Sequence, residues 1–263
     1  GNLPVWGQPG PAAQQVKDTY ETHAKGIRIL PGQWRPHYPW EQIAWISPAW
    51  PSQDYLWLDF PEAIFSNQGL LFLSHVNPKV PGVFPDLPRV AWQEIAQGLA
   101  FERTLPNGIR FGGSLVRKSD TTVALELHIE NGSRQPLTDI KLQTCLYLRA
   151  IKEFADFTND NKFVHLPDLG WQSYPKANEA KVEAGRYRLG WRAGRALADW
   201  SMMATVSNEG KRLVAFTWLK DGFSLVCNAR HPCMHSDPQF PDLAPGAKAS
   251  IHGEIIFFKG TLD

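Results

Sequence analysis

Residues 231–258 read HPCMHSDPQFPDLAPGAKASIHGEIIFF, and this stretch says most about the fold. Its second half, residues 249–258, alternates apolar and polar side chains, which predicts a β-strand because successive strand side chains point to opposite faces. The first half excludes a helix because it contains four prolines, Pro232, Pro238, Pro241 and Pro245. The residue before a proline is restricted to extended backbone. We therefore expect a rigid loop that leads through a Pro-Gly turn into the strand.

This expected loop concentrates reactive side chains. In extended backbone alternate residues share a face, so His231, Cys233, His235 and Asp237 are predicted to point the same way. A carboxylate beside imidazoles suits acid–base chemistry, with Asp237 as the base and His235 or His231 as acid or orienting groups. The alternative is a proline-rich connection whose polar groups bond to their own turns. The sequence leaves both interpretations open.

The rest of the chain also reads as strands, because its apolar residues alternate or form short runs bounded by turn signals such as Asn107-Gly108. The predicted fold is mainly β, a large antiparallel β-sandwich (supersandwich) with few short helices. We expect one domain over residues 1–263, with 1–25 as an N-terminal extension that carries a short helix at 11–24. Strands are expected at 26–30, 42–46, 55–60, 63–65, 69–74, 100–104, 108–118, 122–131, 137–150, 185–191, 202–207, 212–219, 222–228 and 249–258.

Two long stretches, residues 77–89 and 153–180, show neither the alternation of a strand nor the period of a helix. Long irregular stretches inside a compact domain are usually functional loops, so we expect both to lie over a binding cleft. The second stretch mixes carboxylates and rings around His165 and Trp171, a composition that suits sugar binding. His165 is therefore a further candidate acid, and Trp171 a candidate platform for substrate.

Aromatic residues are abundant, with 11 Trp, 14 Phe and 6 Tyr. Many lie between residues 34 and 57, including Trp40 and Trp45. An indole has a flat apolar face and one N–H donor, which suits a sugar ring. We expect Trp40 and Trp45 to contact substrate, although packing in the core is the alternative for any one of them.

Four other side chains are candidates for substrate binding. His75 lies at the end of an apolar strand, where it faces a cleft or caps the strand. Arg110, with Arg117 and Glu62 as further candidates, could meet an acidic sugar, since an arginine fork matches a carboxylate. The alternative for these charges is a solvated strand face.

Charge and hydropathy exclude several classes of partner. The chain has 27 basic and 26 acidic residues, a net charge of +1, and no nucleic-acid motif, so we expect no nucleic-acid partner. No apolar run approaches the roughly 20 residues of a membrane helix, so no membrane partner is expected. Nor does the chain start with a signal peptide, so it is either cytoplasmic, or secreted or periplasmic after a signal was removed. Three cysteines are too few for a disulfide framework.

Two segments resemble the galactose mutarotase-like supersandwich, the fold of the aldose 1-epimerases. Residues 123–138 resemble the family's long strand, turn and hairpin, which lead into a central strand at 140–148. Residues 237–246 resemble its carboxylate-Pro-Gln loop and Pro-Gly turn before the last strand.

The resemblance implies chemistry on a sugar ring. In the epimerases the carboxylate of the C-terminal loop is a general base, and Asp237 takes that place here. The family's partner histidine on the central strand would fall at 144–147, where this chain has none, so the resemblance implies a divergent member with an acid from His165, His231 or His235. The predicted function is a carbohydrate-active enzyme of epimerase, lyase or hydrolase type. The alternative is a non-catalytic glycan-binding module of a polysaccharide-degrading system.

A metal site is the last possibility that the residue types raise. Imidazole, thiolate and carboxylate are all zinc ligands, and His231, His235 and Asp237 could gather a divalent ion with His165 or His75. Cys233, between the histidines, would instead favour a closed structural site. The spacing matches no zinc template, so we expect no metal and no other cofactor, with a divalent ion as the alternative.

Overall fold

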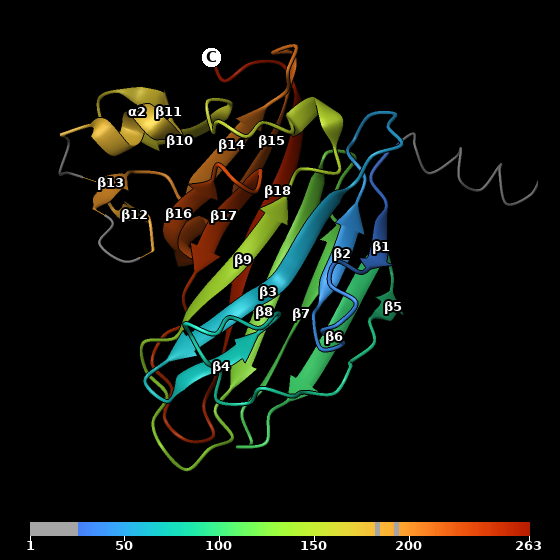
Figure 1. The fold of residues 1–263 in the computed structure, drawn as a ribbon, viewed down its shortest axis with the longest axis vertical. Helices are drawn as coiled ribbons and strands as arrows, with labels where there is room; N and C mark the ends of the chain where they lie inside the picture. The colour runs from blue at the N-terminus through green and yellow to red at the C-terminus, as the bar shows by residue number, and fades with distance from the viewer. Residues whose placement is uncertain (1–25, 182–184, 192–194) are drawn as a thin grey trace, which may run out of the picture.

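The computed structural model describes residues 26–181, 185–191 and 195–263. The expected N-terminal extension and its helix at 11–24 lie outside the described residues. Two nine-stranded sheets, here sheet A and sheet B, pack face to face (Figure 1). The prediction of a mainly β, largely antiparallel sandwich with few short helices is confirmed. None of the described helices is long and apolar enough to cross a membrane.

Sheet A carries β9 and β17 at its centre and is antiparallel except for the parallel pair β12 and β16. In spatial order it contains β1 (Ile29–Gly32), β2 (Ile43–Ile46), β3 (Leu56–Ser66), β9 (Lys141–Tyr147), β17 (Cys233–Pro238), β16 (Gly222–Asn228), β12 (Tyr187–Leu189) and β13 (Ala196–Ala198), with β4 (Gly69–Leu73) beside β3.

Sheet B is antiparallel throughout, and β18, the last strand in the chain, lies near its middle between β15 and β8. In spatial order it contains β11 (Gly170–Ser173), β10 (Lys162–Leu166), β14 (Met202–Val206), β15 (Arg212–Thr217), β18 (Lys248–Lys259), β8 (Thr122–Glu130), β7 (Arg110–Arg117), β6 (Gly98–Thr104) and β5 (Gln93–Ile95). The described helices are short: η1 (Lys152–Phe154), α2 (Tyr174–Glu179) and η2 (Leu219–Asp221).

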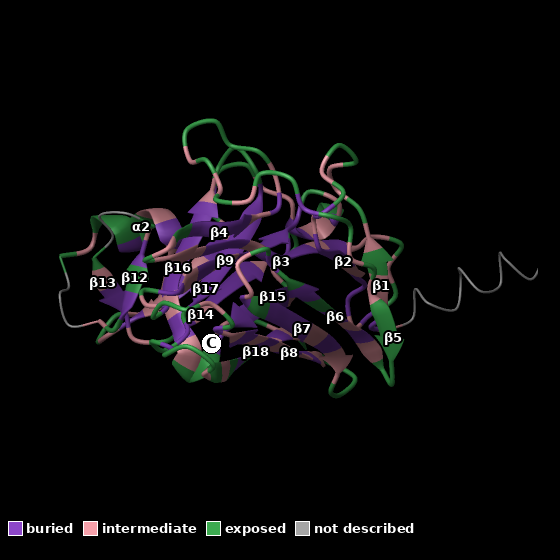
Figure 2. Ribbon diagram, turned by 90° about the horizontal axis from the view of Figure 1, so that it is seen from below, coloured by how far each residue is buried: buried purple, intermediate pink, exposed green. Residues whose placement is uncertain are grey.

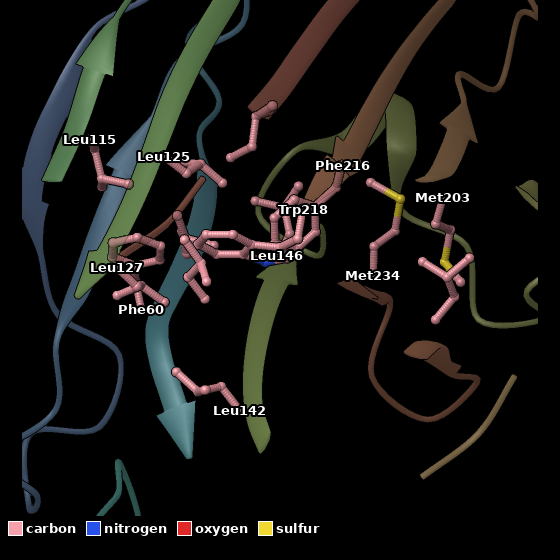
Figure 3. Packing of buried hydrophobic residues seen from close by; sticks show 14 of the residues in the cluster. Phe60, Leu115, Leu125, Leu127, Leu142, Leu146, Met203, Phe216, Trp218 and Met234 are labelled. Carbon is pink, nitrogen blue, oxygen red and sulfur yellow. The ribbon is translucent and has the colours of Figure 1, made fainter. Parts of the chain in front are cut away.

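The apolar faces of the two sheets enclose one large core (Figures 2 and 3). Alternating residues supply it, for example Leu127 from sheet B and Leu146 from sheet A, as expected for strands with one buried face. The indole of Trp218 stacks on Phe60 and donates a hydrogen bond of 3.0 Å to Thr144 Oγ1, so its polar atom is satisfied inside the core. Strands β3 and β9 therefore face the core on one side and leave their other side to the exterior of sheet A.

The predicted loop around His235 is wrong in its backbone, because residues 233–238 form β17, a strand with partners on both sides. The physical reason is the position of the prolines. Pro232 precedes the strand and Pro238 ends it, so the residues between them keep the N–H groups that pair with β9 and β16.

The expectation of a loop at 153–180 is also wrong, since that stretch contains β10, β11 and α2, with β10 paired to β14. The stretch 77–89 has no strand or helix, as expected.

The two segments that carry the family resemblance lie side by side in space. The buried side-chain amide of Asn131, at the end of β8, donates to the carbonyl of Leu243, and the carbonyl of Asn131 accepts from Gly246 N. Leu137 and Leu243 form a β-bridge beside them. These bonds fasten the Pro-Gly turn before β18 to the end of β8.

Candidate active site

A bulge in β3 creates the site. Asp59 pairs with Cys145 and Ala63 with Gln143, so three residues of β3 face one residue of β9. Pro61, within this bulge, lacks the N–H that a regular central strand would need. In an unbroken strand Asp59 and Glu62 would point to opposite faces, but the bulge brings both carboxylates within electrostatic reach of Arg35 on the exterior of sheet A.

Strand register then places further polar side chains beside Asp59. Directly paired residues in antiparallel strands point to the same face. Asp59 on β3 pairs with Cys145 on β9, which pairs with His235 on β17. A neighbouring row consists of Trp45, Trp57, Tyr147 and Cys233. His235 on β17 thus lies directly across from Cys145 on the central strand β9.

A pocket of about 610 Å³ opens on this exterior face. It lies over β3, β4, β9 and β16, and Asn77 and Val80 from the loop 77–89 line it, so this loop lies over a pocket as expected. The other lining residues are Glu62, Phe65, Leu70, Leu73, His75, Lys141, Leu142, Gln143, Trp191, Phe223, Ser224, Asn228 and His231.

Asp237 lies beneath the pocket and not in its wall. Its Oδ1 accepts a hydrogen bond of 2.9 Å from Thr144 N, and its Oδ2 accepts one of 2.7 Å from Trp191 Nε1. Its Oδ1 also lies 3.3 Å from His235 Nδ1, and the residue is only 2% exposed. The geometry makes Asp237 a partner of His235. Its expected role as a base stays a prediction.

His235 is held as a cation by this arrangement. Burial by itself lowers the pKa of an imidazole, but the Asp237 carboxylate and the Cys233 side chain more than offset it and raise the pKa of His235 well above its usual value. The structure brings Cys233, His235 and Asp237 together on one face, as the period-2 pattern predicted, whereas His231, the fourth residue of that prediction, precedes β17.

Glu62 is the carboxylate that reaches the pocket. Its Oε2 is buried without a hydrogen-bond partner among the described residues, 3.6 Å from His235 Nε2. Burial raises the pKa of Glu62 to about 7, although the positive charges of His235 and Arg35 oppose that rise. The carboxyl group, 15% exposed, is therefore divided between its protonated and ionised forms near neutral pH.

His75 lies next to Glu62, and its pKa is displaced in the opposite direction. Its Nδ1 is 4.0 Å from Glu62 Oε1 and 3.3 Å from Ser74 Oγ. Burial lowers the pKa of His75, and the nearby Arg35 cation lowers it further. The imidazole of His75 is therefore neutral at pH 7, beside a carboxyl group that still binds a proton.

An ion pair forms the floor beside these groups. Fully buried Asp59 accepts hydrogen bonds of 2.8 Å from both Arg35 Nη2 and Ser74 Oγ. The other arm of the Arg35 guanidinium donates to Ser74 and to Glu41. This network fixes the position of Ser74 and, through the chain, of His75.

The aromatic residues between 34 and 57 mostly pack on one another. Trp34 stacks on Tyr147 with ring centroids 4.3 Å apart, and Trp45 stacks on Trp57. The indole that the pocket receives is instead that of Trp191, which is 44% exposed and meets the His235 ring edge-on.

Of the remaining candidates, Trp40 and Arg110 lie elsewhere and His231 lines the pocket. Trp40 is buried in the core and donates to the carbonyl of Leu73, so the expected contact with a ligand has no pocket to occur in at this position. Arg110 is a solvated residue of β7 in sheet B, paired with Glu102 and Glu130. His231 lines the pocket and is exposed.

His165 and Trp171 belong to sheet B and do not line the pocket. The Nδ1 of His165 is 2.7 Å from Asp199 Oδ1, and its ring stacks on Trp200 with centroids 3.7 Å apart. Trp171 meets both rings edge-on. The structure thus separates these two candidates from His235 and Asp237.

One group among the described residues has the composition and spacing of a metal site: Cys145, Cys233 and His235, whose ligand atoms lie within 4.8 Å of one another. His231, which we considered as a ligand, is not in it. Both ring nitrogens of His235 face carboxylates, and the two thiols are hydrogen-bonded to each other. The trio supplies three of the four ligands of a structural zinc site. A metal-free site stays our prediction.

Sequence analysis underestimated Glu62 and missed Arg35, Asp59 and Trp191. A signal for Glu62 was present, because Pro61 interrupts two runs that otherwise read as one strand, and a proline there marks a bulge. Arg35 and Trp191 carried no such signal, since only the folded chain brings them to β3 and β17.

The fold and the site define a β-sandwich protein with a polar pocket on the exterior of one sheet. No protein-family model and no curated protein matches the sequence. Among solved structures, one described as a "putative aldose 1-epimerase" from Escherichia coli K12 is similar with a TM-score of 0.44 and 8% sequence identity. The match covers 89% of this chain and 100% of that one.

Proposed function

We propose that this protein is a carbohydrate-active enzyme that moves protons on a sugar ring in the sheet A pocket, with interconversion of anomers as its reaction. One observation carries the proposal. Glu62 Oε1 and His75 Nδ1 lie 4.0 Å apart at the pocket, with pKa values displaced in opposite directions. Neighbouring groups displaced in this way are suited to act as an acid and a base.

Anomer interconversion needs two such groups close together, because the anomeric hydroxyl and the ring oxygen are bonded to the same carbon. Neutral His75 would take the proton of the anomeric hydroxyl while protonated Glu62 gives its proton to the ring oxygen. The bond between C1 and the ring oxygen then breaks to leave an open-chain aldehyde. After rotation about the C1–C2 bond, the ring closes on the other face of the aldehyde and both protons return.

The groups beneath the pocket would act as positioning residues. The His235 cation, fixed by Asp237, lies 3.6 Å from Glu62 and limits how far burial raises the pKa of that carboxyl group. Without the imidazolium, Glu62 would hold its proton too strongly to release it near neutral pH.

Hydrolysis fits the pocket less well. Glycoside hydrolases usually place two carboxyl groups on either side of the scissile bond. Among the described residues Glu62 is the only acidic residue that lines this pocket, while Asp59 and Asp237 are buried and hydrogen-bonded. The sequence resemblance to the mutarotase-like family, which we propose as a distant relationship, agrees with proton transfer without hydrolysis.

The test is anomer exchange measured by NMR for a panel of hexoses, their uronates and their 6-phosphates. We expect wild-type protein to accelerate exchange of at least one sugar above the buffer rate, with no effect of a chelator, and His75→Gln to abolish the acceleration. Acceleration of no sugar in the panel would contradict the proposal.

Sugar binding by calorimetry without any acceleration would instead support a non-catalytic glycan-binding module. The exposed indole of Trp191 in the pocket wall is the observation that favours this second function.

A further inference from the structure

We propose that the sugar bound in this pocket carries an anionic group, a carboxylate or a phosphate, and that Lys141 and Arg188 bind that group. This inference rests on the proposed function only in taking the ligand to be a sugar. It adds an anion subsite at Phe223 of the pocket wall, with Lys141 from β9 and Arg188 from β12.

The geometry of the subsite centres on Phe223, a residue of the pocket wall. The Nζ of Lys141, which also lines the pocket, lies 4.7 Å from the centre of the Phe223 ring. The guanidinium carbon of Arg188 lies 5.2 Å from the same ring. Arg188 reaches this place because β12 pairs with β16 in a register that sets it beside Ser224, another residue of the wall.

These two cations have no anionic partner in the described part of the chain, since no carboxylate oxygen there lies within 4.0 Å of either. Contact with an aromatic face holds a cation in place without using its N–H donors. Those donors therefore stay available to a ligand. Ion pairs do engage other basic side chains: Arg35, Arg110, Arg117, Lys118 and Arg212.

The charge of the pocket wall also favours an anionic ligand. Glu62 is the only acidic residue in the described wall, and burial keeps part of its population neutral at pH 7. Lys141 is a basic residue in the same wall. A wall that is positive on balance attracts an anionic ligand, and the N–H donors of two cations that contact the same Phe223 ring suit the oxygens of a carboxylate or phosphate.

Calorimetry at pH 7 tests the subsite with glucose and galactose, their uronates and their 6-phosphates as probes. We expect an anionic sugar to bind at least about tenfold more tightly than its neutral parent, since a hydrogen bond to a charged group contributes at least that much. Lys141→Gln and Arg188→Gln should each remove most of this preference and leave the Kd of the neutral sugar within about twofold. Which anion is preferred distinguishes a sugar acid from a sugar phosphate.

Arg117→Gln is the matched control, because it removes an exposed arginine of sheet B that is paired with Asp120. Equal affinity for neutral and anionic sugars, no binding of any probe, or a preference that survives both pocket substitutions would overturn the proposal. The same titration of Glu62→Gln tests the anion subsite separately from the proposed reaction, because this variant lacks the proposed acid and keeps Lys141 and Arg188. A preference for anionic sugars without anomer exchange in wild-type protein would reject the proposed reaction and keep the anion subsite.

Discussion

Two of the histidine–carboxylate pairs in the described structure differ in their surroundings, and only one of the two adjoins the sheet A pocket. His235 and Asp237 lie 3.3 Å apart in sheet A, and His165 on β10 of sheet B lies 2.7 Å from Asp199, which follows β13. From distance alone the second pair is the better acid–base candidate. Neither of its residues lines the sheet A pocket or either of two smaller pockets of the described structure.

The difference lies in what surrounds each pair. Trp200 covers one face of the His165 ring, and the carboxylate beside it satisfies the imidazole at the protein surface. In sheet A the His235 ring instead faces Glu62, whose buried Oε2 has no hydrogen-bond partner in the described structure and whose pKa is raised to about 7. A carboxyl group with a displaced pKa and a buried oxygen that accepts no hydrogen bond, at an open pocket, indicates a functional site more strongly than an imidazole beside a carboxylate.

The largest expected effect is on activity. Replacing the acid or the base, by Glu62→Gln or His75→Gln, should lower kcat/KM for anomer exchange by about 10²–10⁴-fold, the usual contribution of general acid–base catalysis. His165→Gln should change it by less than about twofold. Rates from NMR exchange compare the three variants. Loss of activity in His165→Gln at an unchanged melting temperature would move the site to sheet B.

The next effect is on stability. Asp59→Asn removes the fully buried carboxylate partner of the half-buried Arg35 guanidinium and leaves Glu41 as its remaining partner. We expect it to lower the free energy of unfolding by about 3 kcal/mol, the low end for a broken buried pair. Asp199→Asn breaks a partly exposed pair and should cost about 1 kcal/mol or less. Urea denaturation measures both values. Equal losses would mean that the two pairs are equally buried in solution.

The next prediction concerns how the stability of the folded protein depends on pH through Glu62. The pKa of Glu62 rises from 4.5 in the unfolded chain to about 7, so the folded protein binds the extra proton and loses stability as pH rises between those values. The loss amounts to about 3 kcal/mol. Glu62→Gln cannot ionise and should be more stable than wild type by that order at pH 8, with the advantage gone below pH 4.5.

Melting temperatures across this pH range measure the effect, with Glu130→Gln, at an exposed ion pair in sheet B, as the control that should show no such advantage. A Glu62→Gln variant that is less stable than wild type at pH 8 would show that Glu62 is ionised and paired in the folded protein.

The smallest effect concerns the two indoles. Trp191→Phe removes the hydrogen bond to Asp237 Oδ2 and should destabilise the protein by about 1 kcal/mol, the low end for a lost donor because water reaches this half-exposed side chain. Trp200→Phe keeps an aromatic ring on His165 and should have almost no effect. Thermal unfolding compares the two. A larger loss in Trp200→Phe would contradict the view that the surface cluster is energetically minor.

By itself the sequence determined the fold class and much of the strand pattern, because period-2 alternation and turn residues act over a few positions. It also placed Cys233, His235 and Asp237 on one face, since extended backbone does so whether it belongs to a loop or a strand.

Only the tertiary structure decided that β17 is a central strand, that His235 lies opposite Cys145, and that a bulge turns Glu62 toward the pocket. It also separated His165 from this site and moved Trp40 into the core. The physical reason is that strand register joins residues far apart in the chain, and the burial that displaces the pKa of Glu62 exists only after those strands have paired.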